Sequence, residues 1–406
     1  MSKLDELIAE LCPDGVEYKA LEDLFEIKNG YTPSKAKKEY WENGTIPWFR
    51  MEDIRANGHV LADSIQHITP QAVKGKLFPA NSIILATTAT IGEHALLIAD
   101  SLANQQFTFF TKRESLDVQL DMKYVYHYFF IIDEWCKRNV KISSFPAVDM
   151  TKLRQYKMPV PPLEVQREIV HILDSFTLLT AELTAELTAR KKQYEYYRDK
   201  LLITAENAQI VKLEDIAIEI YRGSGIKRDE VTEEGVPCVR YGEIYTTYNT
   251  WFEKCMSHTN LEYVKSPKYF EHGDILFAIT GESVDDIAKS VAYIGHERCL
   301  AGGDIVVMKH NQNPRYLAHA LATTEARMQK SKGKVKSKVV HSNVPSIKEI
   351  KIPLPSLRVQ ERIACVLDNF ESICNDISAG LPAEIEARQK QYEYYRDKLL
   401  SFKEKQ

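Results

Sequence analysis

The chain has 406 residues, of which 44% are apolar and 27% charged, a balance that excludes a wholly disordered or collagen-like protein. Lysine and arginine number 53 against 57 acidic residues, so the net charge of −4 does not by itself indicate a nucleic-acid-binding protein. No apolar run reaches the ~20 residues of a membrane span, the N-terminus is too polar for a secretory signal, and the seven cysteines form no C-x-x-C pair, so we expect a cytoplasmic protein without disulfides, a zinc site or a membrane anchor.

Residues 1–158 combine strand and helix patterns and predict an α/β (α+β) domain large enough to have its own core. Runs rich in β-branched and aromatic residues at 81–86 and 107–110 are typical of strands. The segment 122–135 predicts a helix, and a polar, glycine-containing turn occupies 28–34.

Residues 159–206 predict one long helix. Between Val165 and Leu201, apolar residues recur at steps of three, four and seven without an internal Gly or Pro, which is typical of an amphipathic helix. At ~1.5 Å per residue this helix is about 55 Å long. Because that exceeds the reach of one small domain, we expect a coiled-coil spacer whose stripe packs on a second helix, although the core of an ordinary helical bundle predicts the same stripe.

Residues 207–352 predict a second α/β domain, with a strand at 274–279 and a helix at 314–322. Residues 353–406 predict a second helical segment. The sequence Gly380-Leu-Pro382 interrupts it, and because Pro lacks the backbone donor, we expect a break there and a new helix starting near Pro382.

The chain is an internal repeat. The ten residues from Gln193 to Leu202 recur unchanged from Gln391 to Leu400, and Pro161-Pro-Leu-Glu-Val-Gln166 is echoed by Pro355-Ser-Leu-Arg-Val-Gln360. The two α/β domains echo one another more faintly. We therefore expect two antiparallel helices, two copies of one domain and a pseudo-two-fold axis. Two independent domains on a string are the alternative.

Basic loops at matching places favour binding to double-stranded DNA. Between Arg327 and Lys351 there are eight Lys and Arg against one acidic residue, and the corresponding place in the first domain, 137–144, is also basic. Such loops can follow a phosphate backbone, whereas a single basic loop is more often plain solvated surface. The turns at 28–34 and 221–225 either present polar side chains to base edges or are simple hairpin turns.

The expected contacts form two sets. The expected DNA-binding residues are Asn29, Tyr31, Thr32, Arg50, Lys137, Arg138, Lys141, Ser143, Ser144, Arg222, Ser224, Arg240, Lys330, Lys332, Lys334, Lys336 and Lys338. The expected partner-binding residues on the shared helices are Gln166, Tyr194, Tyr197, Arg198, Gln360, Tyr392, Tyr395 and Arg396.

A tandem tetrapeptide in the first helix suggests a ruler. Thr-Ala-Glu-Leu occurs at 180–183 and again at 184–187. Four residues lengthen a helix by ~6 Å and rotate its end by ~40° beyond a full turn, while one base pair of B-DNA turns by about 34–36°. Adding a tetrapeptide would thus shift a distal domain by about one base-pair rotation. Replication slippage explains the origin of the repeat without excluding this consequence.

Several catalytic patterns are missing from the sequence. It has no P-loop, no G-x-G-x-x-G after a strand, no Asn/Asp-Pro-Pro-aromatic motif and no His/Cys/Asp cluster with metal spacing. We therefore expect no catalytic residue and no metal or cofactor in this chain. A cryptic nuclease or methylase, and a coiled-coil adaptor that binds only proteins, are the alternatives.

The whole chain resembles the specificity subunits of Type I restriction-modification systems. The resemblance rests on Leu11-Cys-Pro-Asp-Gly-Val-Glu-Tyr18, the two Pro-x-Leu-x-x-Gln helix starts, the repeated Gln-Tyr-Glu-Tyr-Tyr-Arg-Asp-Lys-Leu-Leu and the tandem Thr-Ala-Glu-Leu. It implies two target-recognition domains, each reading one half of a split DNA sequence. It also implies two helices that dock two modification (methyltransferase) subunits, with two restriction (motor-nuclease) subunits joining afterwards.

The resemblance places the chemistry in those partners. S-adenosylmethionine, ATP and Mg are expected in the partner subunits, and the specificity subunit itself is expected to catalyse nothing. The family has no short motif in its recognition domains, so the DNA contacts given above rest on this sequence alone.

Overall fold

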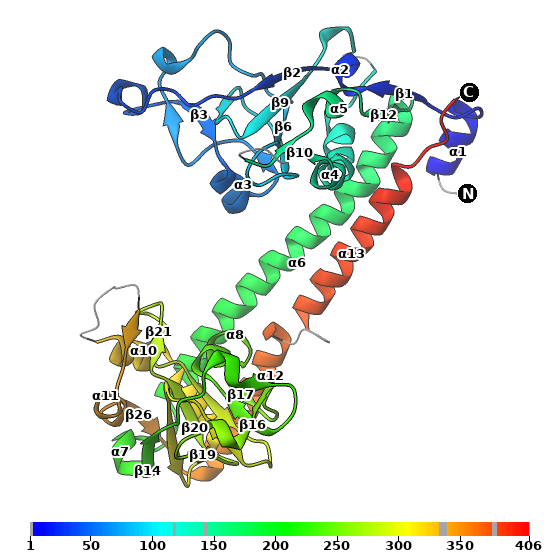
Figure 1. The fold of residues 1–406 in the computed structure, drawn as a ribbon. Coiled ribbons are helices and arrows are strands. Elements are labelled where there is room, and N and C mark those ends of the chain that lie inside the picture. The colour runs from blue at the N-terminus through cyan, green and yellow to red at the C-terminus, as the bar shows by residue number, and fades with distance from the viewer. Residues whose placement is uncertain (1–2, 117–118, 142–144, 333–338, 376–379, 406) are drawn as a thin grey trace. The chain divides into compact units, whose positions relative to one another are not determined.

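The computed structural model describes residues 3–116, 119–141, 145–332, 339–375 and 380–405 (Figure 1). The chain divides into two compact units: a first unit of residues 1–182 and 386–406, and a second unit of residues 183–385. The predicted four-part division at 158, 206 and 352 stays a prediction, since each compact unit combines one α/β domain with parts of the long helices. No helix within the described ranges is both long and apolar enough to cross a bilayer.

The first unit begins with α1 and ends with α13. Its strands are β1 (Glu17–Ala20), β2 (Phe25–Asn29), β3 (Ile46–Phe49), β4 (Val60–Leu61), β5 (His67–Ile68), β6 (Ile83–Ala86), β7 (His94–Leu97), β8 (Leu102–Ala103), β9 (Phe107–Lys112), β10 (Val140–Lys141), β11 (Ala147–Val148) and β12 (Lys157–Val160). Its helices are α1 (Lys3–Leu11), α2 (Leu21–Leu24), α3 (Met51–Asn57), α4 (Met122–Arg138), α5 (Met150–Arg154), the first part of α6 (Leu163–Ile203) and most of α13 (Leu381–Leu399).

A five-stranded sheet with the order β2-β9-β6-β7-β4 forms the centre of the first unit. All four residues of β6 are buried, and they alternate between the two faces of the sheet as a strand requires. Ile83 and Leu85 pack in the same cluster as Phe129 of α4, while Ile84 and Ala86 pack with Phe49 of β3. The strands predicted at 81–86 and 107–110 and the helix predicted at 122–135 are thus confirmed.

The second unit repeats this topology with its own residues. Its strands are β13 (Gln209–Lys212), β14 (Ala217–Arg222), β15 (Val231–Thr232), β16 (Val236–Val239), β17 (Trp251–Phe252), β18 (Ser257–Thr259), β19 (Tyr269–Phe270), β20 (Ile275–Ala278), β21 (Thr280–Gly281), β22 (Ser290–Tyr293), β23 (Cys299–Ala301), β24 (Ile305–His310), β25 (Val340–His341) and β26 (Lys351–Leu354). Its helices are the second part of α6, α7 (Leu213–Ile216), α8 (Tyr241–Thr246), α9 (Pro314–Leu321), α10 (Thr324–Ser331), α11 (Val344–Lys348) and α12 (Leu357–Asn375).

The central sheets of the two units correspond strand by strand. The central sheet has the order β14-β24-β20-β22-β17, and the two-stranded antiparallel sheet β13-β26 matches β1-β12. β20 again alternates, with Ile275 and Phe277 in the cluster that contains α9, and Leu276 and Ala278 on the opposite face. The predicted strand at 274–279, the predicted helix at 314–322 and the internal duplication are confirmed.

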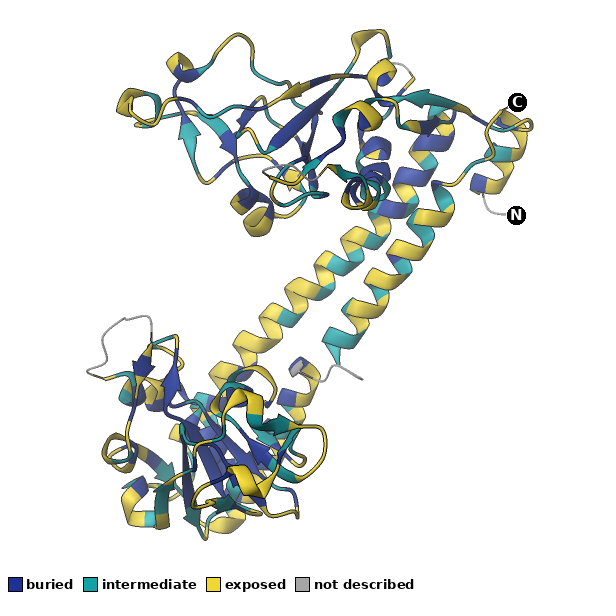
Figure 2. Cartoon of the chain, viewed as in Figure 1, coloured by how far each residue is buried: buried dark blue, intermediate teal, exposed yellow. Residues whose placement is uncertain are grey.

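The long helix α6 confirms the periodicity argument. Val165 and Ile169 at its start are fully buried, whereas the turns around 177–190 are largely exposed (Figure 2). The break predicted near Gly380 is also confirmed, because α12 ends at Asn375 and α13 begins at Leu381.

Each unit pairs the starting helix of one repeat with the tyrosine-rich segment of the other repeat. In the first unit, α13 runs beside the first part of α6 in the opposite direction (Figure 1), and Tyr395 stacks on Phe176 with ring centroids 5.4 Å apart. In the second unit, Tyr197 of α6 stacks on Phe370 of α12 at 6.2 Å. The duplicated sequence therefore builds two equivalent units by exchanging helices between repeats.

Candidate nucleic-acid interface

The predicted turns, and the residues that follow the predicted basic segments, converge at one end of each central sheet. We call this the loop end: it is marked by the pairs Asn29–Thr108 and Ala86–Phe107 in the first unit. In the second unit, the matching pairs are Arg222–Val306 and Ala278–Ile305. Strands β2 and β6, and likewise β14 and β20, finish here, so the segments that follow them lie close together.

The turn after β2 is held tightly against β8. The N–H of Tyr31 donates to the carbonyl oxygen of Ala103 at 2.9 Å, and a Cβ on Gly30 would overlap that same carbonyl. The second unit repeats the arrangement, since the N–H of Ser224 donates to Ala301 at 2.8 Å and Gly223 has no room for a side chain. Glycine is therefore required at both turns by close backbone approach.

Arg50 and Arg240 follow the strands that pair with β8 and β23, and β8 and β23 are also the strands that the two turns contact. β3 pairs in parallel with β8, and the N–H of Asn104 donates to Phe49 at 3.1 Å. This places Arg50, the residue that precedes α3, at the loop end. In the second unit, β16 pairs in parallel with β23, which places Arg240 before α8 in the equivalent position.

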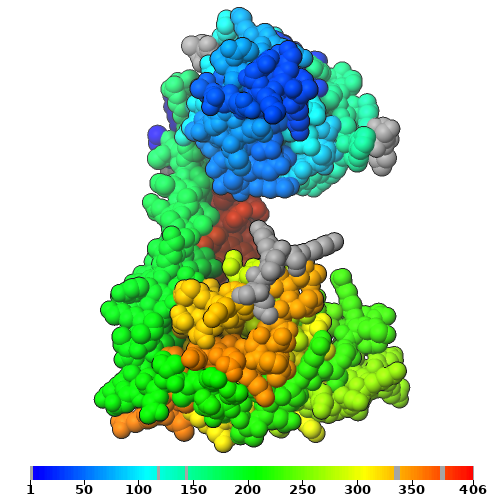
Figure 3. Space-filling model, turned by 90° about the vertical axis from the view of Figure 1, so that its left-hand side faces the viewer, coloured from blue at the N-terminus to red at the C-terminus, as the bar shows by residue number. Residues whose placement is uncertain are grey.

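The individual turn side chains differ in availability. Asn29 is exposed, and its Oδ1 accepts a hydrogen bond from Thr108 Oγ1 at 2.9 Å, which orients its amide. Tyr31 is half-buried, with its hydroxyl accepting from the N–H of Lys74. Figure 3 shows the early part of the chain, in blue, on the surface of the first unit. Thr32 is bonded to the side chain of Gln105 at 2.5 Å.

The second turn is more fully engaged within the chain. Arg222 is exposed but forms an ion pair with Asp304 at 2.7 Å. Ser224 is buried, and its hydroxyl donates to the carbonyl oxygen of Ser266 at 2.5 Å. Its side chain thus fixes the loop and does not face solvent. The expected DNA contact of Ser224 is therefore corrected, because its hydroxyl is not available to DNA.

The first basic segment returns to the loop end through β11. The N–H of Val148 donates to the carbonyl oxygen of Thr87 at 2.9 Å, directly after β6. Lys137 is paired with Glu134 at 2.6 Å and Lys141 with Asp149 at 2.8 Å, while Arg138 is exposed. Ser143 and Ser144 lie outside the described residues.

Lys330 corrects the prediction for the second basic segment. Its ammonium group is buried and donates to Ser290 Oγ at 3.1 Å and to the Leu321 carbonyl oxygen at 2.8 Å. Burial lowers the pKa of Lys330 to about 7. The reason is the helix α10, which turns Lys330 to the same inner face as Ala326 four residues earlier. Lys330 is therefore not on a DNA-facing surface.

The remaining predicted lysines divide into two groups. Lys332 is exposed at the end of α10, while Lys334, Lys336 and Lys338 lie outside the described residues. The chain returns to the loop end after this segment, because β25 pairs with β21 and the N–H of Ser342 donates to Ile279 at 2.8 Å. Val148 and Ser342, which follow the two basic segments in the sequence, thus occupy the same place in their units.

The structure also reveals a basic groove that sequence reasoning missed. A surface hollow of about 1290 Å³ in the first unit extends from Asn29 and Tyr31 along β2 and the end of β9. Its lining includes two acidic residues, Glu26 and Glu114, against six cations: Lys28, Lys74, Lys76, Lys112, Arg113 and Arg154. These cations come from four separate stretches of sequence, so no cluster of basic residues in the sequence predicted the groove.

Comparison with known proteins decides the family. A sequence model described as the "Type I restriction modification DNA specificity domain" matches residues 13–190 and again residues 205–387. The chain belongs to the Type I restriction-modification specificity subunit family. It is 37% identical over 394 residues to the Type I restriction enzyme EcoprrI specificity subunit of Escherichia coli, covering 93% of each chain. It is 32% identical over 306 residues to the EcoR124I/EcoR124II specificity subunit of the same species, covering 69% of this chain and 71% of the relative.

A solved structure supports the fold. A chain from a study of complex assembly and conformational transition in a type I restriction-modification system aligns with a TM-score of 0.64 at 15% identity, over 96% of this chain and 98% of that chain. Together with the family match, this confirms the predicted fold class. Family membership likewise confirms the expected role in DNA recognition and the assignment as a recognition subunit rather than an enzyme.

The predicted partner contacts of the specificity subunit are mostly internal contacts. Gln166 is buried, and its side chain bonds the N–H of Asp121 and the carbonyl oxygens of Gln119 and Pro161. In the second unit, the side chain of Gln360 bonds the N–H of Asn313, the side-chain Oε1 of Gln312 and the carbonyl oxygen of Pro355. Each glutamine ties the start of its helix to the loop before α4 or α9, so neither is available to another subunit.

The tyrosine repeat has an inner and an outer face. Tyr194, Arg198 and Tyr392 are buried, while Tyr395 and Arg396 are half-buried and Tyr197 is 38% exposed. The predictions for the three buried side chains are corrected, since they contact their own unit. Tyr196 and Tyr394, which sequence reasoning did not select, are 60% and 63% exposed.

The buried face contains a matched hydrogen-bond network that sequence reasoning also missed. In the first unit, the ring of His127 bonds Tyr392 Oη at 2.9 Å and Asp174 Oδ1 at 3.0 Å. Because a carboxylate only accepts, His127 Nε2 donates to Asp174, and the tyrosine hydroxyl donates to Nδ1. Burial lowers the pKa of His127, which keeps the ring neutral, while its hydrogen bond lowers the pKa of Asp174.

The second unit contains the same three groups. His319 bonds Tyr194 Oη at 3.0 Å and Asp368 Oδ1 at 2.8 Å. The signal in the sequence was a shared helical pattern, Lys123-Tyr-Val-Tyr-His127 and Arg315-Tyr-Leu-Ala-His319, in which a basic residue precedes the histidine by four. Each network joins the α/β domain to both helices packed on it.

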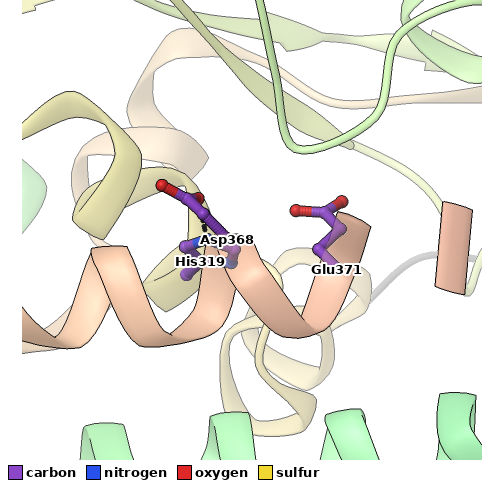
Figure 4. Close-up of side chains that lie close together, drawn as sticks. All are labelled: His319, Asp368 and Glu371. Atoms are coloured by element: carbon purple, nitrogen blue, oxygen red, sulfur yellow. Dashed lines mark hydrogen bonds and ion pairs between the residues drawn. The ribbon is translucent and has the colours of Figure 1, made fainter. Parts of the chain in front are cut away.

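His319, Asp368 and Glu371 lie close enough to suggest a metal site (Figure 4). Their oxygen and nitrogen atoms are already engaged, because Asp368 accepts from His319, Trp251 and Arg315 and Glu371 accepts from Thr250. The position equivalent to Glu371 in the first unit is Thr177. The cluster is therefore explained as part of the hydrogen-bond network.

Proposed function

We propose that each unit of this specificity subunit reads one half of a bipartite target in double-stranded DNA, with an unread spacer between the halves. The observation that carries the proposal is the duplication of the loop end: both units hold a glycine turn, an arginine before a short helix and a returning chain segment, at Val148 or Ser342, at the equivalent end of the central sheet. Phosphate contacts from the basic groove would position the duplex, and the turn and arginine would reach base edges.

We infer that the subunit acts in the cytoplasm with two modification subunits, to which two restriction subunits are added. The exposed tyrosines Tyr196 and Tyr394 support a docking role for the helices, because aromatic side chains are enriched at the centres of protein interfaces. S-adenosylmethionine, ATP and Mg would be bound by those partners.

Nuclease protection of the chain assembled with its modification subunits tests the proposal. Two protected patches that require defined sequence, separated by a stretch whose sequence is free, are expected on target DNA. One continuous sequence-specific patch, or binding without sequence preference, would contradict the proposal. Cleavage or methylation of DNA by the purified chain alone would favour the alternative, a cryptic nuclease or methylase.

Deleting 184–187 is expected to change the spacer preferred by the complex by about one base pair while leaving both half-sites unchanged. The reason is that α6 contains both tetrapeptides in one continuous helix, and removing four residues keeps the helix face nearly in phase. Selection from a DNA library with variable spacers measures this. Thr184→Ala, which preserves length at an exposed position, is the control, and a changed half-site in the deletion would refute the ruler.

A further inference from the structure

Arg50 and Arg240 occupy equivalent positions with equivalent anchors. Each is the last residue before a short helix, α3 or α8. The N–H of Arg50 donates to Asp53 Oδ2, and the N–H of Arg240 donates to Glu243 Oε2, both at 2.6 Å. A carboxylate three residues later thus fixes the backbone of each arginine.

The two anchoring carboxylates are already occupied. Asp53 is fully buried, and its other oxygen accepts from the N–H of Ile65 at 2.6 Å. Glu243 is 9% exposed, and its other oxygen accepts from Ser257 Oγ at 2.6 Å. Neither carboxylate therefore forms a fork-to-fork pair with its arginine.

The side chains of both arginines have the same unsatisfied atom. Nε of Arg50 and Nε of Arg240 are buried and have no hydrogen-bond partner among the residues that the structure describes. Nε of Arg50 lies 3.9 Å from Glu52 Oε2, which is too far for a hydrogen bond, and the guanidinium lies over the Trp48 ring at 5.8 Å. A buried N–H without an acceptor is costly, and its occurrence at the same position in both units indicates that the acceptor is supplied by a ligand.

The space beside Arg240 suits a flat ligand edge. The arginine borders a hollow of about 670 Å³ that also includes Gly225, Gly242 and Gly302. A Cβ at Gly225 or Gly242 would meet no atom, so these glycines leave open space, whereas Gly302 lies directly against the backbone of Arg240. The floor of the hollow therefore lets another molecule approach the guanidinium closely.

We propose that Arg50 and Arg240 are base-reading residues, each contacting one guanine in the half-site of its own unit. The inference rests on the proposed function and identifies the chemistry of its specificity. An arginine presents parallel N–H donors that match O6 and N7 of guanine in the major groove, a pattern that the other three bases do not offer. A phosphate contact would use the same donors without sequence information.

The test compares base preferences of the complex with modification subunits on a randomised duplex library, for the wild type and for R50K, R50Q, R240K and R240Q. The R50 variants are expected to lose discrimination for guanine at one position of one half-site by roughly 10- to 100-fold, with the other half-site unchanged. The R240 variants are expected to do so in the other half-site. Lysine retains the charge but not the planar fork, so R50K and R240K separate base reading from charge.

Lys76→Gln, which removes a groove cation, is the matched control and is expected to weaken binding about equally for all sequences. The inference is overturned if R50K and R240K keep every base preference of the wild type, or if a wild-type half-site has no guanine position. A wild-type complex that selects no bipartite sequence refutes the proposed function instead. Unfolding curves for all variants identify any that fail to fold. If the glutamine variants do not fold, the base preferences of R50K and R240K decide whether the arginines read guanine.

Discussion

The double substitution K74E/K76E is expected to reduce DNA affinity of the complex by about 100-fold at moderate salt and to lower the salt dependence of binding by about one unit of slope per residue. Both lysines are exposed on the basic groove of the first unit, beside the turn that contains Tyr31. Lys74 also lies over the Tyr31 ring at 5.7 Å. Each reversal removes a cation that would release counterions from DNA and adds a repulsive charge.

A second double reversal controls for net charge. K157E/K403E makes the same change at exposed positions near the two-stranded sheet β1-β12, where Lys157 approaches Glu404 at 3.9 Å and the carbonyl oxygen of Lys403 accepts from the N–H of Val16. We expect this variant to bind DNA within a few-fold of the wild type, because its charges lie outside the groove. Fluorescence anisotropy over a salt series measures both variants, and equal losses would show that net charge rather than the groove controls affinity.

The parts of the fold that were predicted correctly depend on local patterns. The helix over 165–201 was apparent because its stripe continues for ten turns, and β6 was apparent because Ile83 to Ala86 form a short apolar run between turn signals. The repeat was predicted because ten residues recur unchanged. Arg50 and Arg240 were among the expected DNA-binding residues, and the structure places them at the same end of each sheet as the turns.

The parts that were missed depend on residues far apart in the sequence. His127 and Tyr392 meet because α13 returns to the first unit, and no local pattern encodes that exchange of helices. The basic groove assembles from separated strands and loops for the same reason. Lys330 was misassigned because a run of alternating cations resembles an exposed loop, whereas the first of these cations belongs to the inner face of α10.

Replacing either buried histidine by leucine is expected to lower the free energy of unfolding by about 2–4 kcal/mol. Each substitution removes one hydrogen bond from a tyrosine hydroxyl and one from a carboxylate. In H127L the affected groups are Tyr392 and Asp174, and Asp174 keeps its bond to Lys123 at 2.7 Å. In H319L they are Tyr194 and Asp368. Leucine is similar to histidine in size, so the loss reports hydrogen bonding rather than a cavity.

His171→Leu is the matched control, since His171 is an exposed histidine on α6 and surface substitutions usually change stability by within about 0.5 kcal/mol. Denaturant unfolding measures the change in the free energy of unfolding, and hydrogen exchange shows which helices lose protection. H127L is expected to lose amide protection in α4 and α13, and H319L in α9 and the second part of α6, because each histidine bonds the tyrosine of the exchanged helix in its own unit. If either variant matched H171L in stability and exchange, the network would not be what attaches the exchanged helices, and α13 would be held to the first unit by the packing of Phe176 on Tyr395 and the neighbouring apolar contacts alone.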